Sequence, residues 1–345
     1  MQDEILFEKC GRAGMIILNR PKALNAVTMN MVELMGPQLE QWAKDEAISH
    51  VIIKAAEGRA FSAGGDIVQL YKWGRDNDPR FAKFYELEYP LNVAIKNFPK
   101  PYIALIDGIV MGGGVGVSFH GSHRIVTENL TFAMPETGIG LFPDVGGTYF
   151  LPRCPGAIGM YLGLTGARVK AADAIYTRLA THYVPAENLP ALETALCLSK
   201  DIDATIAEFS TDPGSAPLAE RKKQIGRHFR KLSVQAIIES LAGDEDEWAA
   251  KTLASLKQKS PTSLAVTHKQ LLSGVGLSFE MAMRLEYRIV NRIIRHGDFL
   301  EGTRAVVIDK DMQPKWNPAS LDEVSKSDIA AYFAPLETEL QLPKI

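Results

Sequence analysis

The sequence pattern of this chain centres on residues 100–153, KPYIALIDGIVMGGGVGVSFHGSHRIVTENLTFAMPETGIGLFPDVGGTYFLPR. Within it, residues 102–106 form a short apolar run rich in β-branched side chains and bounded by proline and glycine, which predicts a buried strand. Three glycines, residues 112–114, precede a helix that we expect over residues 115–119. Glycines at a helix start leave backbone N–H groups unshielded, so the positive end of the helix dipole can meet a negative oxygen.

Two acidic residues follow these glycines. A second strand is predicted at residues 130–133, Glu136 comes soon after it, and Asp144 lies eight residues further on. Backbone donors and two carboxylates in one segment are typical of an active site. From the local pattern alone, tight-turn glycines and solvated acids are an equal alternative. The segment matches neither a phosphate-binding loop nor G-x-G-x-x-G, and its nearest approach to the G-x-S-x-G elbow lacks the last glycine.

Composition limits the class of protein. With 345 residues, 46% of them hydrophobic, the chain can bury a substantial core in one large domain or two. A net charge of −3 argues against a nucleic-acid partner, which requires a basic face. No apolar run is long enough to indicate a membrane partner. Three scattered cysteines and an acidic N-terminal segment without leader features predict free thiols and a cytoplasmic location.

Strand and helix patterns alternate along the first half of the chain. Residues 15–18 and 51–55 are predicted strands, and residues 28–44 between them have apolar side chains at helical spacing. The same order of strand, strand, glycine turn and helix recurs around Ile103 and Phe132. This repetition indicates an α/β fold of repeated β/β/α units, with buried sheets and helices outside.

The second half of the chain is predicted to be mainly helical. Residues 211–217, TDPGSAP, are the strongest linker signal, and glycines divide a long helical tract at residues 274–276. We therefore expect a core with the active site over residues 1–200 and a helical C-terminal portion over residues 201–345.

Four segments carry a resemblance to a known family. Residues 58–67 (GRAFSAGGDI), 109–114 (IVMGGG), 133–147 (AMPETGIGLFPDVGG) and 301–310 (EGTRAVVIDK) are similar to the enoyl-CoA hydratase/isomerase (crotonase) superfamily. Within it they resemble the branch that hydrolyses 3-hydroxyisobutyryl-CoA in valine degradation, over about residues 19–318 of this chain. The resemblance implies a spiral crotonase fold and a coenzyme A (CoA) thioester substrate.

The resemblance also implies how the site works. The backbone N–H groups of Gly65 and Gly113 would form an oxyanion hole for the thioester carbonyl oxygen. Glu136 would attack the carbonyl carbon or activate water, and Asp144 would orient substrate or water or assist departure of the thiol. Hydratases of the family use two glutamates, and the first of these positions is Gly116 here. We therefore expect hydrolysis of a short branched 3-hydroxyacyl-CoA, with an enoyl-CoA hydratase or isomerase, and a catalytically silent binding subunit, as the alternatives.

The remaining implied contacts concern the substrate. Those to CoA would be made mainly by backbone groups of two segments, and one glutamate would contact the acyl part: Lys22, Ala23, Leu24, Ala63, Gly64, Asp66, Ile67 and Glu88. For Asp66, a favourable charge in a first helical turn is a better explanation than a part in catalysis. His120 and His123 form an H-x-x-H pair without the spacing or carboxylate of a zinc site, so no metal is expected. No cofactor is expected beyond the CoA of the substrate, and a homo-oligomer is possible.

Overall fold

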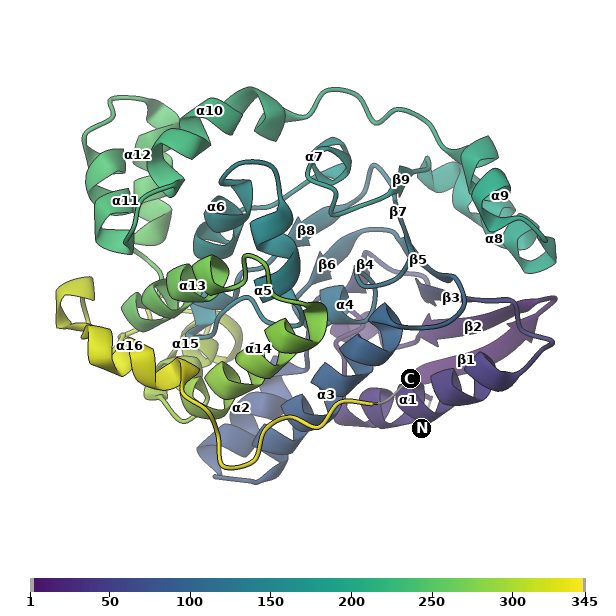
Figure 1. Cartoon of the computed structure of the whole chain (residues 1–345), viewed down its shortest axis with the longest axis horizontal. Helices are drawn as coiled ribbons and strands as arrows, with labels where there is room; N and C mark the ends of the chain where they lie inside the picture. The colour runs from purple at the N-terminus through teal and green to yellow at the C-terminus, as the bar shows by residue number, and fades with distance from the viewer. Residues whose placement is uncertain (1–2, 344–345) are drawn as a thin grey trace.

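The computed structural model describes residues 3–343 and contains two β-sheets surrounded by helices (Figure 1). The larger sheet has the strand order β1-β2-β3-β5-β7-β9 and the smaller one β4-β6-β8. All pairings are parallel except that of β1 with β2. The strands are β1 (Ile5–Cys10), β2 (Ala13–Leu18), β3 (His50–Ala55), β4 (Ala60–Ser62), β5 (Tyr102–Ile106), β6 (Ile109–Met111), β7 (His123–Val126), β8 (Thr131–Ala133) and β9 (His182–Tyr183).

Three successive strand pairs build both sheets. In each of the pairs β3/β4, β5/β6 and β7/β8, the first strand joins the larger sheet and the second strand joins the smaller one. Each pair thus advances both sheets by one strand, which produces the spiral. The predicted fold of repeated β/β/α units is confirmed.

Both faces of the larger sheet are covered, because the side chains of its strands alternate between two hydrophobic clusters. Ile52 and Ile103 face a small cluster that includes residues of α8 and α9, whereas Val51 and Ile53 belong to the main cluster with α1 and α3. This alternation explains why the central strands are apolar throughout, as expected for parallel strands buried on both faces.

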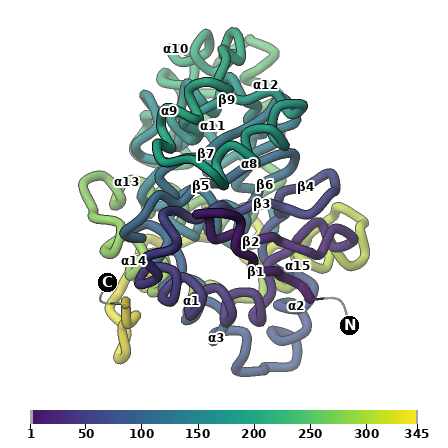
Figure 2. Tube along the Cα trace, turned by 90° about the vertical axis from the view of Figure 1, so that its right-hand side faces the viewer, coloured from purple at the N-terminus to yellow at the C-terminus, as the bar shows by residue number. Residues whose placement is uncertain are grey.

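The helices enclose this frame and extend away from it. Figure 2 shows α1 to α3 at one end of the molecule and α10 to α12 at the opposite end. Helix α14 packs against α3 and α5, and α13 packs against α5 and α6. The helices are α1 (Met29–Lys44), α2 (Ile67–Arg75), α3 (Arg80–Lys96), α4 (Gly113–Gly116), α5 (Gly147–Phe150), α6 (Ile158–Thr165), α7 (Ala171–Tyr176), α8 (Leu189–Leu198), α9 (Ile202–Phe209), α10 (Pro217–Phe229), α11 (Val234–Ala242), α12 (Glu247–Leu256), α13 (Pro261–Ser273), α14 (Phe279–Ile293), α15 (Gly297–Thr303) and α16 (Lys326–Phe333).

The mainly helical C-terminal portion is also confirmed. From residue 202 to residue 333 the regular elements are helices, and residues 211–216, inside the predicted linker, have no regular structure. The glycine break at residues 274–276 separates α13 from α14. Within residues 3–343, no helix is both long and apolar enough to cross a lipid bilayer.

Candidate active site

Three strand ends bring the predicted site residues together. Strands β4, β6 and β8 are parallel neighbours, so their carboxyl ends lie at one edge of the smaller sheet. The chain leaves β4 toward Gly65, leaves β6 toward Gly113 and leaves β8 toward Glu136. Carboxyl ends of parallel strands are a common place for ligand sites in α/β proteins.

Two backbone donors at this edge have no internal acceptor. Neither the N–H of Gly65 nor that of Gly113 makes a hydrogen bond among the described residues. The two groups are close, because a Cβ atom built on Gly113 would lie 3.1 Å from the Gly65 nitrogen. Gly113 begins α4, so its N–H has no partner in the helix. A single oxygen can therefore accept from both donors.

Three carboxylates surround these donors in a small cavity of about 80 Å³. Glu88 is on α3, Glu136 follows β8 and Asp144 precedes α5, and their side chains are 2%, 5% and 7% exposed. A Cβ on Gly113 would come within 2.8 Å of Oε1 of Glu88, and one on Gly112 within 3.2 Å of Oε1 of Glu136. Glycine is required here because any side chain would fill the space between donors and acids.

Burial leaves carboxylate oxygens in this cavity without partners and shifts the pKa values of the acids. Oε1 of Glu88 and Oε2 of Glu136 are buried without a hydrogen-bond partner. Burial, followed by the charge of Asp144, raises the pKa of both glutamates well above the usual value. Burial also raises the pKa of Asp144 to about 6, although the Tyr89 hydroxyl opposes the rise by donating to Oδ2 at 2.8 Å. Burial thus raises the pKa of all three carboxyl groups, and the Tyr89 hydroxyl favours the charged form of Asp144.

The loop carrying Asp144 is held by a buried glutamate that sequence reasoning missed. The two carboxylate oxygens of Glu286 on α14 accept hydrogen bonds from the N–H groups of Gly146 and Thr148, both at 2.8 Å. This side chain is fully buried. Its signal was present in the sequence, since Glu286 occupies the apolar face of α14 between Met283 and Ile289.

Two further polar side chains hold the same loop. Gln270 of α13 donates to the Pro143 carbonyl at 2.6 Å, and His120 donates through Nε2 to the Val145 carbonyl at 2.7 Å. Val145 has a φ angle of 45°, a left-handed conformation that is costly for a β-branched residue and requires such support, whereas Gly146 adopts its φ of 92° without strain. Together with Glu286, these side chains fix the backbone on which Asp144 stands.

The predicted substrate-binding residues divide into two groups. Ala63, Gly64, Ile67 and Glu88 line the cavity together with the four predicted catalytic residues. The other four do not line it: Lys22, Ala23, Leu24 and Asp66. The carbonyl of Leu24 nevertheless accepts from the N–H of Ala63 at 2.9 Å, so the segment around Leu24 borders the cavity wall.

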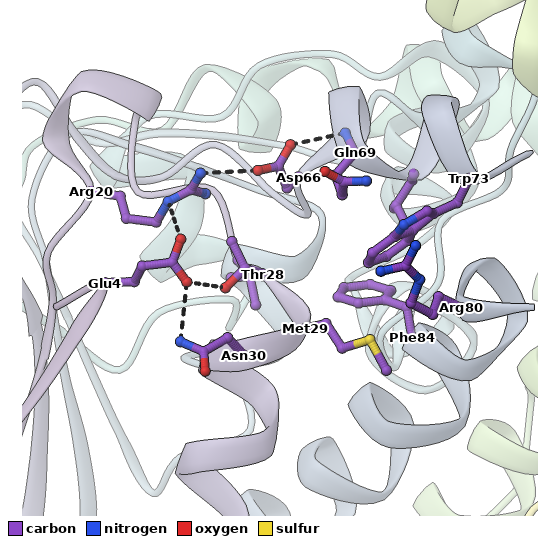
Figure 3. A pocket seen from close by; sticks show the side chains of 12 residues that line it. Glu4, Arg20, Thr28, Met29, Asn30, Asp66, Gln69, Trp73, Arg80 and Phe84 are labelled. Carbon is purple, nitrogen blue, oxygen red and sulfur yellow. Dashed lines mark hydrogen bonds and ion pairs between the residues drawn. The ribbon is translucent and has the colours of Figure 1, made fainter. Parts of the chain in front are cut away.

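Asp66 has a structural role in a neighbouring pocket (Figure 3). It caps α2 by accepting from the Gln69 N–H at 3.1 Å, and it pairs with Arg20 at 3.0 Å. Arg20 also pairs with Glu4 at 3.1 Å. The Asp66 carboxylate is thus already paired inside the protein, which supports the alternative that it stabilises the helix start.

Gly116 occupies the position where hydratases of the family have the first of their two glutamates, and the space around it is tight. A Cβ on Gly116 would lie 2.9 Å from Nδ2 of Asn92 and 3.0 Å from Cβ of Val145. A larger side chain at this position would have to displace the side chains of Asn92 and Val145. Among residues 3–343, moreover, no three His, Cys, Asp or Glu side chains are grouped so as to hold a metal ion.

Comparison with known proteins places this geometry in a family. Proteins named mitochondrial 3-hydroxyisobutyryl-CoA hydrolase from Xenopus tropicalis and Homo sapiens are 47% and 44% identical to this chain. The alignments cover 96% and 97% of this chain and 89% of each relative. The expected cytoplasmic location is contradicted by these relatives, which are named mitochondrial. Free cysteines indicate a reducing environment, but they do not tell the cytoplasm from the interior of a mitochondrion.

Solved structures agree on the fold. A carnitinyl-CoA dehydratase from Mycobacterium thermoresistibile superposes with a TM-score of 0.95 at 39% identity, covering 99% of both chains. An enoyl-CoA hydratase from Rhodobacter sphaeroides gives 0.93 at 39% identity, covering 99% of this chain and 100% of the other. The profile of the enoyl-CoA hydratase/isomerase family matches residues 13–333. The chain therefore belongs to the enoyl-CoA hydratase/isomerase family.

Proposed function

We propose that this protein hydrolyses the thioester of 3-hydroxyisobutyryl-CoA, giving 3-hydroxyisobutyrate and free CoA. The observation that carries the proposal is that the free N–H groups of Gly65 and Gly113 belong to the same small cavity as buried Glu136 and Asp144. The names of relatives at 44–47% identity support the same substrate. A cavity of about 80 Å³ suits a short acyl group rather than a long one.

In the proposed reaction the thioester carbonyl oxygen accepts hydrogen bonds from the N–H groups of Gly65 and Gly113. These donors stabilise the negative charge that develops when the carbonyl carbon is attacked. Asp144 supports departure of the CoA thiol, and the unpaired oxygen of Glu88 provides a hydrogen-bond partner for the 3-hydroxyl group. Water is consumed and no electron is transferred, so we propose no cofactor besides the CoA of the substrate.

Glu136 can act by either of two routes. As a nucleophile, its carboxylate forms an anhydride with the acyl group, the thiol leaves, and water then hydrolyses the anhydride. As a general base, it removes a proton from the water that attacks the carbonyl directly. A single turnover in ¹⁸O-water separates the routes, because only the anhydride route can place label in the Glu136 side chain.

The principal alternative is an enoyl-CoA hydratase or dehydratase, the activities named for the two solved structures at 39% identity. The absence of an acid at position 116, and of space for one, argues against it. Free-thiol release from 3-hydroxyisobutyryl-CoA and loss of crotonyl-CoA absorbance, measured side by side, test the proposal. We expect rapid thiol release and negligible hydration; rapid hydration without thiol release would contradict the proposal.

The other alternative is a silent binding subunit, and Glu136→Gln addresses it. This change removes the ionisable group while keeping its shape, so we expect thiol release to fall at least about a hundredfold. A variant as active as the unmodified protein would remove Glu136 from the mechanism. The homo-oligomer remains a prediction, which light scattering on the purified protein tests.

A further inference from the structure

A second cavity, of about 430 Å³, shares no lining residue with the thioester cavity. We call it the basic cavity, because four of its lining residues are cationic and none is acidic. The four cations come from the end of α3, from β7, from the turn after α5 and from the turn after α7. The lining residues that matter below are Lys96, Arg124, Arg153, Arg178, His120, Phe119, Tyr149 and Phe150.

Arg124 brings a charge into this cavity without a counter-charge. Its Nε donates to the Leu179 carbonyl at 2.8 Å and its Nη1 to the Gly121 carbonyl at 2.9 Å, so the guanidinium is fixed in place. No carboxylate pairs with it among the described residues. Burial lowers the pKa of Arg124, which is the sign of an incompletely solvated cation. An unpaired, partly buried charge is costly, and an anion in the cavity would relieve that cost.

Arg153 and Lys96 add to the same positive region. The Arg153 guanidinium lies 3.6 Å from the centre of the Tyr149 ring, and Nζ of Lys96 lies 5.7 Å from that centre. Burial lowers the pKa of Lys96, and the charges of Arg124 and Arg153 lower it further. The carboxylate that opposes this shift belongs to Glu280, which is already hydrogen-bonded to Asn97 at 2.9 Å and does not line the cavity.

The chemistry of the walls defines the occupant. Guanidinium groups match the oxygen geometry of phosphate, and a flexible lysine adds a further charge-assisted donor. Phe119, Tyr149 and Phe150 also line the cavity, so an apolar part of an occupant can contact aromatic side chains. We propose that the basic cavity binds a small phosphate-bearing anion with a flat apolar part, at a site separate from the thioester cavity.

This site is connected to the catalytic loop by one residue. His120 lines the basic cavity and donates to the carbonyl of Val145, the residue after Asp144. A Cβ on Gly146 would lie only 2.5 Å from the His120 ring, so ring and loop are in close contact. The basic cavity therefore borders a side chain that holds the loop of Asp144.

Calorimetric titration of the full-length protein with phenyl phosphate at low ionic strength tests the proposal. We expect one binding site in the unmodified protein. Lys96→Met and Arg178→Met each remove a cation whose side chain makes no hydrogen bond among the described residues, so we expect both variants to keep their melting temperature. Each should bind at least roughly tenfold more weakly, as expected for the loss of one charge-assisted contact.

Lys83→Met is the matched control, because it makes the same change on the same helix outside the basic cavity. It should bind as tightly as the unmodified protein. The proposal is wrong if the unmodified protein shows no binding up to a concentration of about 10 mM. It is equally wrong if Lys96→Met binds as tightly as Lys83→Met.

CoA also carries phosphates, so a second titration is made with saturating CoA present. We expect the affinity for phenyl phosphate to stay within about twofold, because the two cavities share no residue. Loss of binding in the presence of CoA would assign these cations to CoA and overturn a separate site. The titration requires no turnover, so its outcome is independent of the proposed hydrolysis.

Discussion

Gly113 shows how far a single methyl group can alter this site. Its N–H is one of the two free donors, and a Cβ there would lie 2.8 Å from Oε1 of Glu88 and 3.1 Å from the Gly65 nitrogen. Gly113→Ala should therefore exclude the thioester oxygen and lower kcat for thiol release by about 10²–10³, the usual effect of losing one oxyanion donor.

The control for this substitution is Gly36→Ala in α1, where a Cβ would meet nothing within 4 Å. This variant should keep its activity and gain a little stability, because alanine is the better helix former. If Gly113→Ala retained the kcat of the unmodified protein, the oxyanion hole would have to be elsewhere.

The pH dependence of hydrolysis follows from the burial of Glu136. Either route requires this side chain to be ionised, and burial and Asp144 raise its pKa well above 4.5. Below that raised pKa, kcat/KM should climb about tenfold per pH unit and still be rising above pH ~5.5, where an ordinary glutamate is already ionised. Assays of thiol release from pH 5 to 9 measure this limb.

Asp144→Asn provides the second arm of the pH experiment. It removes a negative charge that disfavours ionisation of Glu136, so the acid limb of the residual activity should move to lower pH. A rate that is flat from pH 5 to 8 in the unmodified protein would show that no group with a raised pKa limits hydrolysis.

At the scale of elements, α14 holds the loop of Asp144 through Glu286, and we expect this contact to affect catalysis. Glu286→Gln keeps one acceptor but turns an NH₂ group toward a backbone N–H of Gly146 or Thr148, where a carboxylate oxygen now accepts. Asp144 should then be displaced, lowering kcat by roughly 10–100-fold with little change in KM, because the donors of Gly65 and Gly113 are untouched.

Two comparisons separate positioning from general destabilisation. Glu286→Ala removes both acceptors and should lower kcat further than Glu286→Gln does. Glu280→Gln makes the isosteric change in the first turn of the same helix, at a carboxylate that bonds Asn97 instead of the loop. It should leave kcat unchanged. A fall in melting temperature for Glu286→Gln with kcat preserved would assign Glu286 to stability alone.

Local sequence patterns predicted helices and strands well where apolar residues had a regular spacing and turn or capping residues marked both ends. The strand expected at residues 102–106 is β5 to the residue, and the helix expected at residues 28–44 is α1, capped by the Thr28 hydroxyl at 3.1 Å from the Met31 nitrogen. The helix expected at residues 115–119 is wrong in extent, since α4 spans Gly113–Gly116. In the turn that follows, the Ser118 hydroxyl donates to the Gly114 carbonyl at 2.6 Å, a local side-chain bond that competes with continuation of the helix.

The site was predictable only where its residues share a segment or a family motif. Gly113, Glu136 and Asp144 lie within 32 positions of one another, whereas Glu286 reaches Gly146 across 140 positions. No spacing rule links residues so far apart, because their contact depends on how α14 packs on α3 and α5. A charged residue on an apolar helix face was the available signal, and it identifies a buried acid without naming its partner.

At the scale of the whole molecule, the boundary expected near residue 200 is crossed by the core. One hydrophobic cluster contains Ile5 of β1, Phe142 beside the site, Ile289 of α14 and Leu340 near the C-terminus. The division of the chain into two domains, residues 1–200 and 201–345, stays a prediction. As a division of function it conflicts with the clamp on the Asp144 loop, which comes from α13 and α14.

Cutting the chain between Asp212 and Pro213, inside the irregular segment of residues 211–216, tests this dependence. The fragment of residues 1–212 carries Gly65, Gly113, Glu136 and Asp144 but lacks Glu286 and Gln270, so the Asp144 loop loses its support. We expect this fragment alone to release no thiol, and co-expression with residues 213–345 to restore a complex with most of the original activity. Restoration is expected because the cut segment contributes little to the core, while large apolar surfaces of the two fragments match. Thiol release and co-purification of the fragments are the measurements. Full activity of residues 1–212 alone would mean that the first two hundred residues hold the Asp144 loop without the C-terminal helices.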